Sequence, residues 1–249
     1  MIKISNLTKE YGDVKVVDSL SLEVKKGNIF GFLGPNGAGK TTTIKMIVGL
    51  AQRSSGEISI NGKELESLGS REKIGYMPED PYFYEQLTAV ELLQYMAELF
   101  KNRDKITKLA HIEEILELVG LKDVAKKKVG AFSKGMKQRL GLAQAIINNP
   151  DYLFLDEPLD GLDPIGRLEF KDIFLKLKKR GKTIFFNSHV LSDVEEICDE
   201  IGIINNGILV YAGPVKPFCQ NEPLEKRFVE IINEQISKSA SQQISKEEA

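Results

Sequence analysis

The sequence Gly34-Pro35-Asn36-Gly37-Ala38-Gly39-Lys40-Thr41 occurs once in this chain of 249 residues and matches the pattern G-x-x-x-x-G-K-[ST]. The apolar run Ile29 to Leu33 precedes it, and a helical pattern that ends near Gly49 follows it. A predicted strand and a predicted helix therefore flank the pattern, as a phosphate-binding loop requires. This context favours such a loop over a glycine-rich turn without a function.

The chemistry of the loop follows from its residue types. Its glycines let backbone N–H groups approach phosphate oxygens without a Cβ in the way, and the start of the next helix adds partial positive charge. We expect Lys40 to reach the β- and γ-phosphates of a nucleotide and Thr41 to bind Mg²⁺. The loop residues expected to bind phosphate are Gly34, Pro35, Asn36, Gly37, Ala38, Gly39, Lys40, Thr41 and Thr42. Kinases, GTPases and many ATPases share this loop, so it predicts a P-loop NTPase and nothing narrower.

Two acids follow a second apolar run, Tyr152 to Leu155. In a parallel sheet, a buried central strand delivers such side chains to its carboxyl end, beside the phosphate loop. We expect Asp156 to lie on the Mg²⁺ side and Glu157 to orient and polarise the attacking water, because phosphoryl transfer depends on positioning and electrostatics. The alternative is a strand that runs into an acidic turn, which the upstream phosphate loop disfavours.

Hydrophobic patterning divides the rest of the chain into three parts. The first part predicts an antiparallel, hairpin-rich start, and its runs are Ile2 to Leu7, Ser21 to Val24, Ile29 to Leu33 and Glu57 to Ile60. Glu79 to Ala145 is mostly helical, with helices over Leu87 to Phe100 and Ile106 to Val119. From Asp151, a helix over Pro164 to Arg180 separates the strands Tyr152 to Leu155 and Thr183 to Phe186, which predicts a parallel sheet with covered faces.

The composition limits the classes of partner. A net charge of -2 lacks the broad basic surface that nucleic-acid binding requires, so we expect no nucleic-acid partner. The two cysteines, Cys198 and Cys219, fit a reducing, cytosolic compartment. No apolar stretch approaches the roughly 18 residues that span a bilayer, and the start lacks the regions of a signal peptide. If the protein serves a membrane, we expect another chain to cross it.

A third motif indicates which class of P-loop protein this chain resembles. Phe132-Ser133-Lys134-Gly135-Met136, shortly before Asp151, resembles the signature of ABC transporter ATP-binding subunits, usually written LSGGQ. Ser133 is a good N-cap and Gly135 permits close backbone approach, so the helix that runs to Ile147 would point its N-terminus at an anion. The resemblance implies that this anion is the γ-phosphate of ATP held by a second copy of the subunit.

Other positions match the family in order. Tyr11 matches the aromatic residue that stacks on adenine, and Glu79 lies in the loop that senses nucleotide and touches the permease. Asp163 ends the stretch that matches the D-loop, and His189 matches the histidine that contacts the γ-phosphate. Without the resemblance, Tyr11 is equally a core aromatic and a single histidine is more often structural. The resemblance thus adds Tyr11, Ser133, Gly135 and Asp163 to the ATP-binding residues and implies that Glu157 and His189 are catalytic.

The chain departs from the family pattern at Glu79, where glutamine is usual, at Lys134 and Met136 in the signature, and at Leu159, where threonine is common. A carboxylate at position 79 adds negative charge near Asp156 and Glu157, which Mg²⁺, Lys40 and helix ends must offset. We therefore expect Glu79 to contact the metal directly or through water, which completes a predicted Mg²⁺ set of Thr41, Asp156 and Glu79.

The resemblance also implies the architecture. We expect an α/β fold: a P-loop NTPase core with a parallel sheet, an N-terminal antiparallel β subdomain and an inserted α-helical subdomain at about residues 80–145. The ABC ATPase domain is expected to cover residues 1–236 and to end in an amphipathic helix from Glu222 to Ile236. The polar tail, residues 237–249, is expected to be disordered.

The motif variants, with Gly161 to Arg167 and Ser188 to Asp193, resemble the ATP-binding subunits of ABC-2 type exporters. This resemblance implies ATP and Mg²⁺ as cofactors, a head-to-tail homodimer, integral membrane permease subunits as partners, and a peripheral location at the cytoplasmic face of the membrane. Pro81 to Tyr84 is a candidate surface for the permease, or else these aromatics pack the helical subdomain.

Two other functions stay open at this point. A soluble ABC ATPase that acts on ribosomes, DNA or iron–sulfur assembly would preserve every motif, although the tandem cassettes or long coiled coils of several such proteins are absent from the sequence. A nucleotide-gated interaction module that binds ATP and barely hydrolyses it is the second alternative, which Glu79 makes conceivable.

Overall fold

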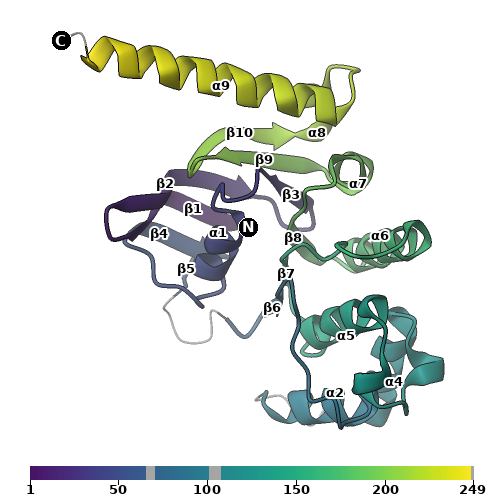
Figure 1. Ribbon diagram of the computed structural model, residues 1–249. Helices are drawn as coiled ribbons and strands as arrows, with labels where there is room; N and C mark the ends of the chain where they lie inside the picture. Colours follow the sequence, from purple (N-terminus) through teal and green to yellow (C-terminus); the bar gives the residue numbers. More distant parts are fainter. Residues whose placement is uncertain (66–70, 101–107, 248–249) are drawn as a thin grey trace.

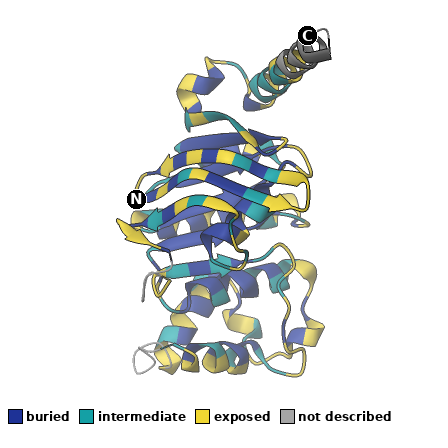
Figure 2. Cartoon of the chain, turned by 90° about the vertical axis from the view of Figure 1, so that its left-hand side faces the viewer, coloured by how far each residue is buried: buried dark blue, intermediate teal, exposed yellow. Residues whose placement is uncertain are grey.

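The computed structural model describes residues 1–65, 71–100 and 108–247, and it places two sheets side by side with most helices on one flank (Figure 1). The first sheet is antiparallel, with the strand order β2-β1-β4-β5. Its strands are β1 (Ile2–Tyr11), β2 (Val14–Val24), β4 (Ser55–Ile60) and β5 (Lys63–Glu64). Buried and exposed residues alternate along β1 and β2, so one face meets the core and the other faces solvent (Figure 2).

The second sheet has the order β10-β9-β3-β8-β7-β6. Its strands are β3 (Ile29–Leu33), β6 (Ile74–Met77), β7 (Tyr152–Leu155), β8 (Thr183–Asn187), β9 (Glu200–Asn205) and β10 (Ile208–Pro214). The pairs β6·β7, β7·β8, β8·β3 and β3·β9 are parallel, and β10 is antiparallel to β9. Every residue of β3, β7 and β8 is buried. These three strands therefore hold their carboxyl ends at one edge, where ligands bind in open α/β sheets.

One strand of the expected antiparallel start belongs elsewhere. Ile29–Leu33 forms β3 at the centre of the parallel sheet, between β8 and β9, so its grouping with the antiparallel runs is wrong. The physical reason is visible in its composition, since all five residues are apolar or glycine and are buried on both faces of the sheet.

Side chains that alternate along these strands supply two separate hydrophobic clusters. Phe30, Phe154 and Phe185 point toward the antiparallel sheet, and the rings of Phe30 and Phe185 stack with centroids 5.2 Å apart. Leu33 and Phe186 point to the opposite face, where helices cover them. The parallel sheet is therefore packed on both faces, which makes its loop-bearing edge a rigid platform.

The helices lie around the two sheets (Figure 1). They are α1 (Lys40–Ile47), α2 (Ala89–Glu98), α4 (Leu109–Leu118), α5 (Lys134–Ile146), α6 (Pro164–Lys179), α7 (Leu191–Ile197), α8 (Val215–Cys219) and α9 (Leu224–Glu247), with short 3₁₀ helices at η1 (Lys122–Val124) and η2 (Val129–Ala131). Thr88 and Glu91 cap α2 reciprocally, and Ser133 caps α5, as the signature predicts. α2, α4 and α5 lie between β6 and β7 in sequence, where the helical subdomain is predicted. The first part of the predicted helix from Ile106, up to residue 107, lies outside the described residues.

Helix α9 runs from Leu224 to Glu247, beyond Ile236, where the predicted amphipathic helix ends, and residues 248–249 lie outside the described residues. The tail contains no Gly or Pro, and its Lys, Gln, Glu and Ala favour helix, so nothing in it ends the helix that Leu224 begins. Disorder of the tail stays a prediction.

Candidate nucleotide-binding site

The loop between β3 and α1 has a backbone that only glycine satisfies at two positions. Gly39 has a φ of 105°, and a Cβ there would lie 2.6 Å from the carbonyl oxygen of Val16. A Cβ at Gly34 would lie 2.3 Å from the carbonyl oxygen of Ile204. These contacts explain why the sequence places glycine at both ends of the loop, where it curls around an anion-sized space.

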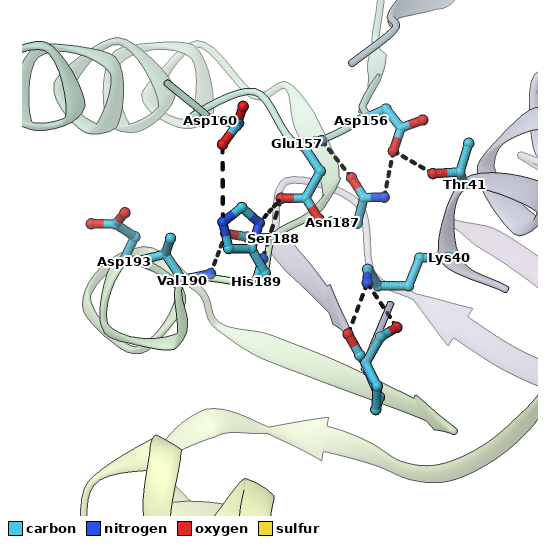
Figure 3. Close-up of polar contacts among 12 residues, drawn as sticks. Lys40, Thr41, Asp156, Glu157, Asp160, Asn187, Ser188, His189, Val190 and Asp193 are labelled. Atoms are coloured by element: carbon cyan, nitrogen blue, oxygen red, sulfur yellow. Dashed lines mark hydrogen bonds and ion pairs between the residues drawn. The ribbon is translucent and has the colours of Figure 1, made fainter. Parts of the chain in front are cut away.

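Lys40 is the first residue of α1, and its side chain turns back to the loop (Figure 3). Its ammonium Nζ donates to the carbonyl oxygens of Gly34, at 2.8 Å, and Pro35, at 3.2 Å. The side chain is buried, and this burial lowers the pKa of Lys40, although Glu157, Asp156 and Glu79 act in the opposite direction. A buried ammonium that the carbonyls of the loop hold in place is suited to bind phosphate.

Two oxygen ligands meet next to the loop. The hydroxyl of Thr41 donates to Oδ1 of Asp156 over 2.9 Å, and Asp156 is 1% exposed at the end of β7. Mg²⁺ prefers such hard oxygens and takes its remaining ligands from phosphates and water. Among the residues that the structure describes, no three or more His, Cys, Asp or Glu side chains are grouped to hold a metal by themselves. The Thr41 and Asp156 pair therefore fits a Mg²⁺ ion that arrives with a nucleotide.

Glu157 and His189 form a direct pair across two loops. Oε2 of Glu157 accepts a hydrogen bond from the backbone N–H of His189, at 3.2 Å, and lies 2.9 Å from the ring atom Nδ1. The other ring nitrogen, Nε2, lies 4.0 Å from the carboxylate of Asp160. The histidine side chain is half exposed and opens toward the cleft, so these residues can orient a polar group that enters it.

Glu79 lies in the same cleft, after β6. Its partial burial raises the pKa of its carboxyl, and the charges of Asp156 and Glu157 raise it further. Its backbone carbonyl accepts a hydrogen bond from the buried Gln138 of α5, at 3.2 Å. Glu79, which stands where the family has glutamine, thus interacts electrostatically with the acids of the cleft, and its backbone is hydrogen-bonded to α5, the helix that Ser133 caps.

These elements line one cleft of about 530 Å³. Its lining residues are Val16, Asn36, Gly37, Ala38, Gly39, Lys40, Thr41, Thr42, Glu79, Glu157, Asp160 and His189. Most of the residues predicted for phosphate, metal and catalysis therefore lie together. Gly34 and Pro35 support the lysine from behind, and Asp156 lies under Thr41.

Besides Gly34, Pro35 and Asp156, four predicted residues lie outside the lining of this cleft. Tyr11 ends β1, is 55% exposed and carries the Lys9 ammonium 4.5 Å above its ring, so it is not a core residue. Ser133 is exposed, and its Oγ accepts from the N–H of Met136, at 3.3 Å. Gly135 is in the first turn of α5, and Asp163 caps α6 by accepting from the N–H of Gly166.

The sequence assigns no individual role to three residues of the site, although one of them, Asp160, begins the stretch that matches the D-loop. Val16 and Asp160 line the cleft, and the carboxylate of Asp160 pairs with Lys134 at 2.8 Å, which lowers its pKa. Asn187 is fully buried beneath the two acids and hydrogen-bonds to both. Its position at the carboxyl end of β8, next to β7, is the signal that was available, because parallel strands end at the same edge.

The residues from Pro81 to Tyr84 fit partly a permease surface and partly packing of the helical subdomain. Phe83 is buried in the core, whereas Tyr82 is 97% exposed and Tyr84 is exposed against Tyr95, with ring centroids 6.0 Å apart. The aromatic cluster therefore packs one ring into the helical region and presents the others at the surface.

A phosphate loop that opens a helix, a lysine inside it and a hydroxyl–carboxylate pair beside it define a P-loop nucleotide-binding protein. The family model described as ABC transporter matches residues 17–160. The chain belongs to the ABC transporter family, and its signature Ser133 and Gly135 stand within the matched range.

Relatives support this assignment. The chain is 46% identical to an ABC transporter ATP-binding protein of Synechocystis over 84% of its own length and 59% of the relative's, so it spans less than two thirds of that protein. It is 48% identical to the bacitracin transport ATP-binding protein BcrA of Bacillus licheniformis, over 84% of the chain and 68% of the relative. It is 39% identical to the lantibiotic transport ATP-binding protein SrtF of Streptococcus pyogenes, over 95% and 97%.

A solved structure agrees in fold. The ATP-binding subunit of an ABC transporter matches with a TM-score of 0.85 and 29% identity, over 93% of this chain and 99% of that one. The predicted α/β class, with a parallel core sheet, an antiparallel N-terminal sheet and helices, is confirmed. None of the helices in the described part of the chain has the length and apolar character that a membrane crossing needs.

Proposed function

We propose that the chain binds and hydrolyses ATP with Mg²⁺ and powers a membrane ABC transporter, with export as its direction. The observation that carries this proposal is the convergence of Lys40, Thr41, Glu157 and His189 on one cleft. Relatives whose names include bacitracin transport and lantibiotic transport support transport as the process.

The residues divide the chemistry among them. The Lys40 ammonium and the loop N–H groups bind the β- and γ-phosphates, and Thr41 and Asp156 hold the metal, which supplies charge to offset the transferred phosphoryl group. Glu157 accepts a hydrogen bond from the attacking water and polarises it. His189 holds the carboxylate of Glu157 with its backbone N–H and ring, and it is exposed enough to contact the γ-phosphate.

A second copy completes the site in this proposal. Ser133 and Gly135 lie at the exposed start of a 13-residue helix, outside the cleft that holds Lys40. Helix N-termini attract anions, so this start is suited to the γ-phosphate that a partner holds. Two copies related by twofold symmetry would then share two ATP molecules, with each copy supplying one half of each site. Permease subunits would bind this pair of copies and keep the chain at the cytoplasmic face of the membrane.

The signature contact predicts a specific loss in Ser133→Ala. This change removes a helix cap, which costs about 1 kcal/mol of stability, and in the proposed dimer it also removes a donor to phosphate, which lowers ATP turnover about tenfold or more. Thr88→Ala is the matched control, because the Thr88 side chain also caps a helix, α2, but stands outside the signature sequence. Phosphate release and thermal unfolding of both variants separate the effects. Equal turnover in the two would contradict the phosphate role of Ser133.

The carboxylate of Glu79 predicts altered metal dependence. In Glu79→Gln the cleft loses one negative charge next to Asp156 and Glu157, so attraction for Mg²⁺ weakens and the half-activating Mg²⁺ concentration rises. A Mg²⁺ titration of ATP turnover at fixed ATP measures this shift, with Glu114→Gln on the surface as control. A titration curve that coincides with that of the unmodified chain would remove the proposed metal contact of Glu79.

The proposed reaction is tested by phosphate release from purified chain, with ATP and with or without Mg²⁺. We expect continuous, Mg²⁺-dependent release. A chain that binds ATP without releasing phosphate would instead be a nucleotide-gated interaction module.

A further inference from the structure

We propose that Asn187 is a positioning residue for ATP hydrolysis, which holds the carboxylate of Asp156 and the backbone of Glu157 in a fixed relation to each other. This inference rests on the proposed function, because it concerns the ATPase reaction. Asn187 does not line the cleft, and it acts through its two neighbours.

The contacts are reciprocal and use both ends of one amide (Figure 3). Nδ2 of Asn187 donates to Oδ1 of Asp156, and Oδ1 of Asn187 accepts from the backbone N–H of Glu157 at 2.6 Å. The orientation of the amide follows from its partners, since a carboxylate only accepts and a backbone N–H only donates. Asn187 is 0% exposed, so no water can replace either hydrogen bond.

The first contact fixes the metal-side acid. Oδ1 of Asp156 receives the Asn187 amide from one side and the Thr41 hydroxyl from the other. Two donors on one oxygen restrict rotation of the carboxylate, and they come from β8 and α1, which are separate elements of the fold. Asp156 is thereby held against Thr41, in the first turn of the helix after the phosphate loop.

The second contact fixes the catalytic acid. Glu157 has a φ of 46°, in the left-handed region that non-glycine residues rarely adopt. The hydrogen bond from its N–H to Asn187 holds this turn, which directs the Glu157 side chain to His189. A rotation of this peptide would move the Glu157 carboxylate away from the place where it meets the cleft.

The residue type suits the charge of its surroundings. Glu79, Asp156 and Glu157 bring three carboxylates to one region, which Lys40 only partly offsets. An amide supplies one donor and one acceptor without adding charge. Aspartate in its ionised form would lack the donor and add a fourth negative charge, and leucine, of similar shape, would provide neither hydrogen bond.

The test compares Asn187→Leu and Asn187→Asp with Asn28→Asp. Asn28 is the matched control, because its Nδ2 also donates to a carboxylate, that of Glu200, at 3.2 Å and outside the cleft. In N187L we expect kcat to fall about 100-fold, as for a displaced catalytic group, while the KM for ATP and the ATP affinity stay within about threefold. N28D should keep the kcat of the unmodified chain. A folded N187L with unchanged kcat would overturn the proposal.

N187D gives a second readout. The introduced carboxylate can accept from the backbone N–H of Glu157 but offers no donor to Oδ1 of Asp156. We therefore expect kcat of N187D to fall well below that of N28D while the KM for ATP changes little, a split that a merely structural role would not produce.

These outcomes separate this inference from the proposed function. A folded N187D with the kcat of N28D contradicts the positioning role, and this variant decides the question if N187L does not fold. Absence of turnover in the unmodified chain would remove the proposed ATPase function itself. Normal turnover in the unmodified chain, with equal turnover in N187L, removes only the role of Asn187.

Discussion

Glu157→Gln is expected to lower kcat for ATP hydrolysis by about 10²- to 10⁴-fold while ATP binding stays close to normal. The amide has the shape of the carboxylate but is a far weaker base, so it no longer polarises the attacking water. The groups proposed to bind phosphate, which are Lys40, Thr41 and the loop N–H groups, are untouched. Phosphate release under saturating ATP and Mg²⁺, together with ATP binding by calorimetry, measures both parts of this expectation.

Glu114→Gln serves as the control for a glutamate-to-glutamine change, since Glu114 pairs with Arg180 on the surface. In the proposed dimer, E157Q should also accumulate as an ATP-bound pair of subunits, because closure no longer ends in hydrolysis. Light scattering with and without ATP records that pair. If the unmodified chain turned over ATP no faster than E157Q, the chain would be a nucleotide-gated module and not an ATPase.

The second large effect is expected for Lys40→Met, which should weaken ATP binding about 100-fold. The ammonium is held inside the loop by Gly34 and Pro35, so it needs little reorganisation to bind phosphate. A hydrogen bond between charged groups is worth about 1.5–3 kcal/mol, or roughly a tenfold to hundredfold change in affinity. We expect the upper end of that range, because Lys40 is buried and is the only lysine that lines the described cleft.

Lys45→Met is the matched control for this change, because Lys45 stands on the same helix, α1, and faces solvent. K40M should fold normally, since burial already disfavours the charged form of Lys40 in the nucleotide-free chain. Calorimetric titration with ATP compares the two variants. Comparable ATP affinity in K40M and K45M would show that the loop does not bind phosphate as proposed.

Local patterns were sufficient for the buried core of the fold. β3 and β7 begin and end where continuous apolar runs begin and end, because strands of a buried parallel sheet need apolar residues on both faces. The apolar pattern predicts β1 and β2 shorter than they are, because exposed residues alternate with buried ones along both strands and interrupt the apolar signal. The sheet to which Ile29–Leu33 belongs depends on its partner strands, β8 and β9, and the local sequence pattern does not reveal them.

The site shows the same division between local and distant information. Lys40, Asp156 and Glu157 stand in motifs whose flanking strands were visible in the sequence, so their convergence could be predicted. Asn187 could not, because a single asparagine at a strand end has no local signature, and its contacts depend on the pairing of β7 with β8. The capping role of Ser133 was predictable from its neighbours, whereas its distance from the cleft follows only from how α5 packs.

The proposed role as a transporter subunit is tested most directly by isolating the tagged full chain from membranes and identifying what co-purifies. The account predicts a stoichiometric integral membrane protein with several membrane-spanning segments. Co-purification with ribosomes or an assembly complex, without such a membrane partner, would contradict it.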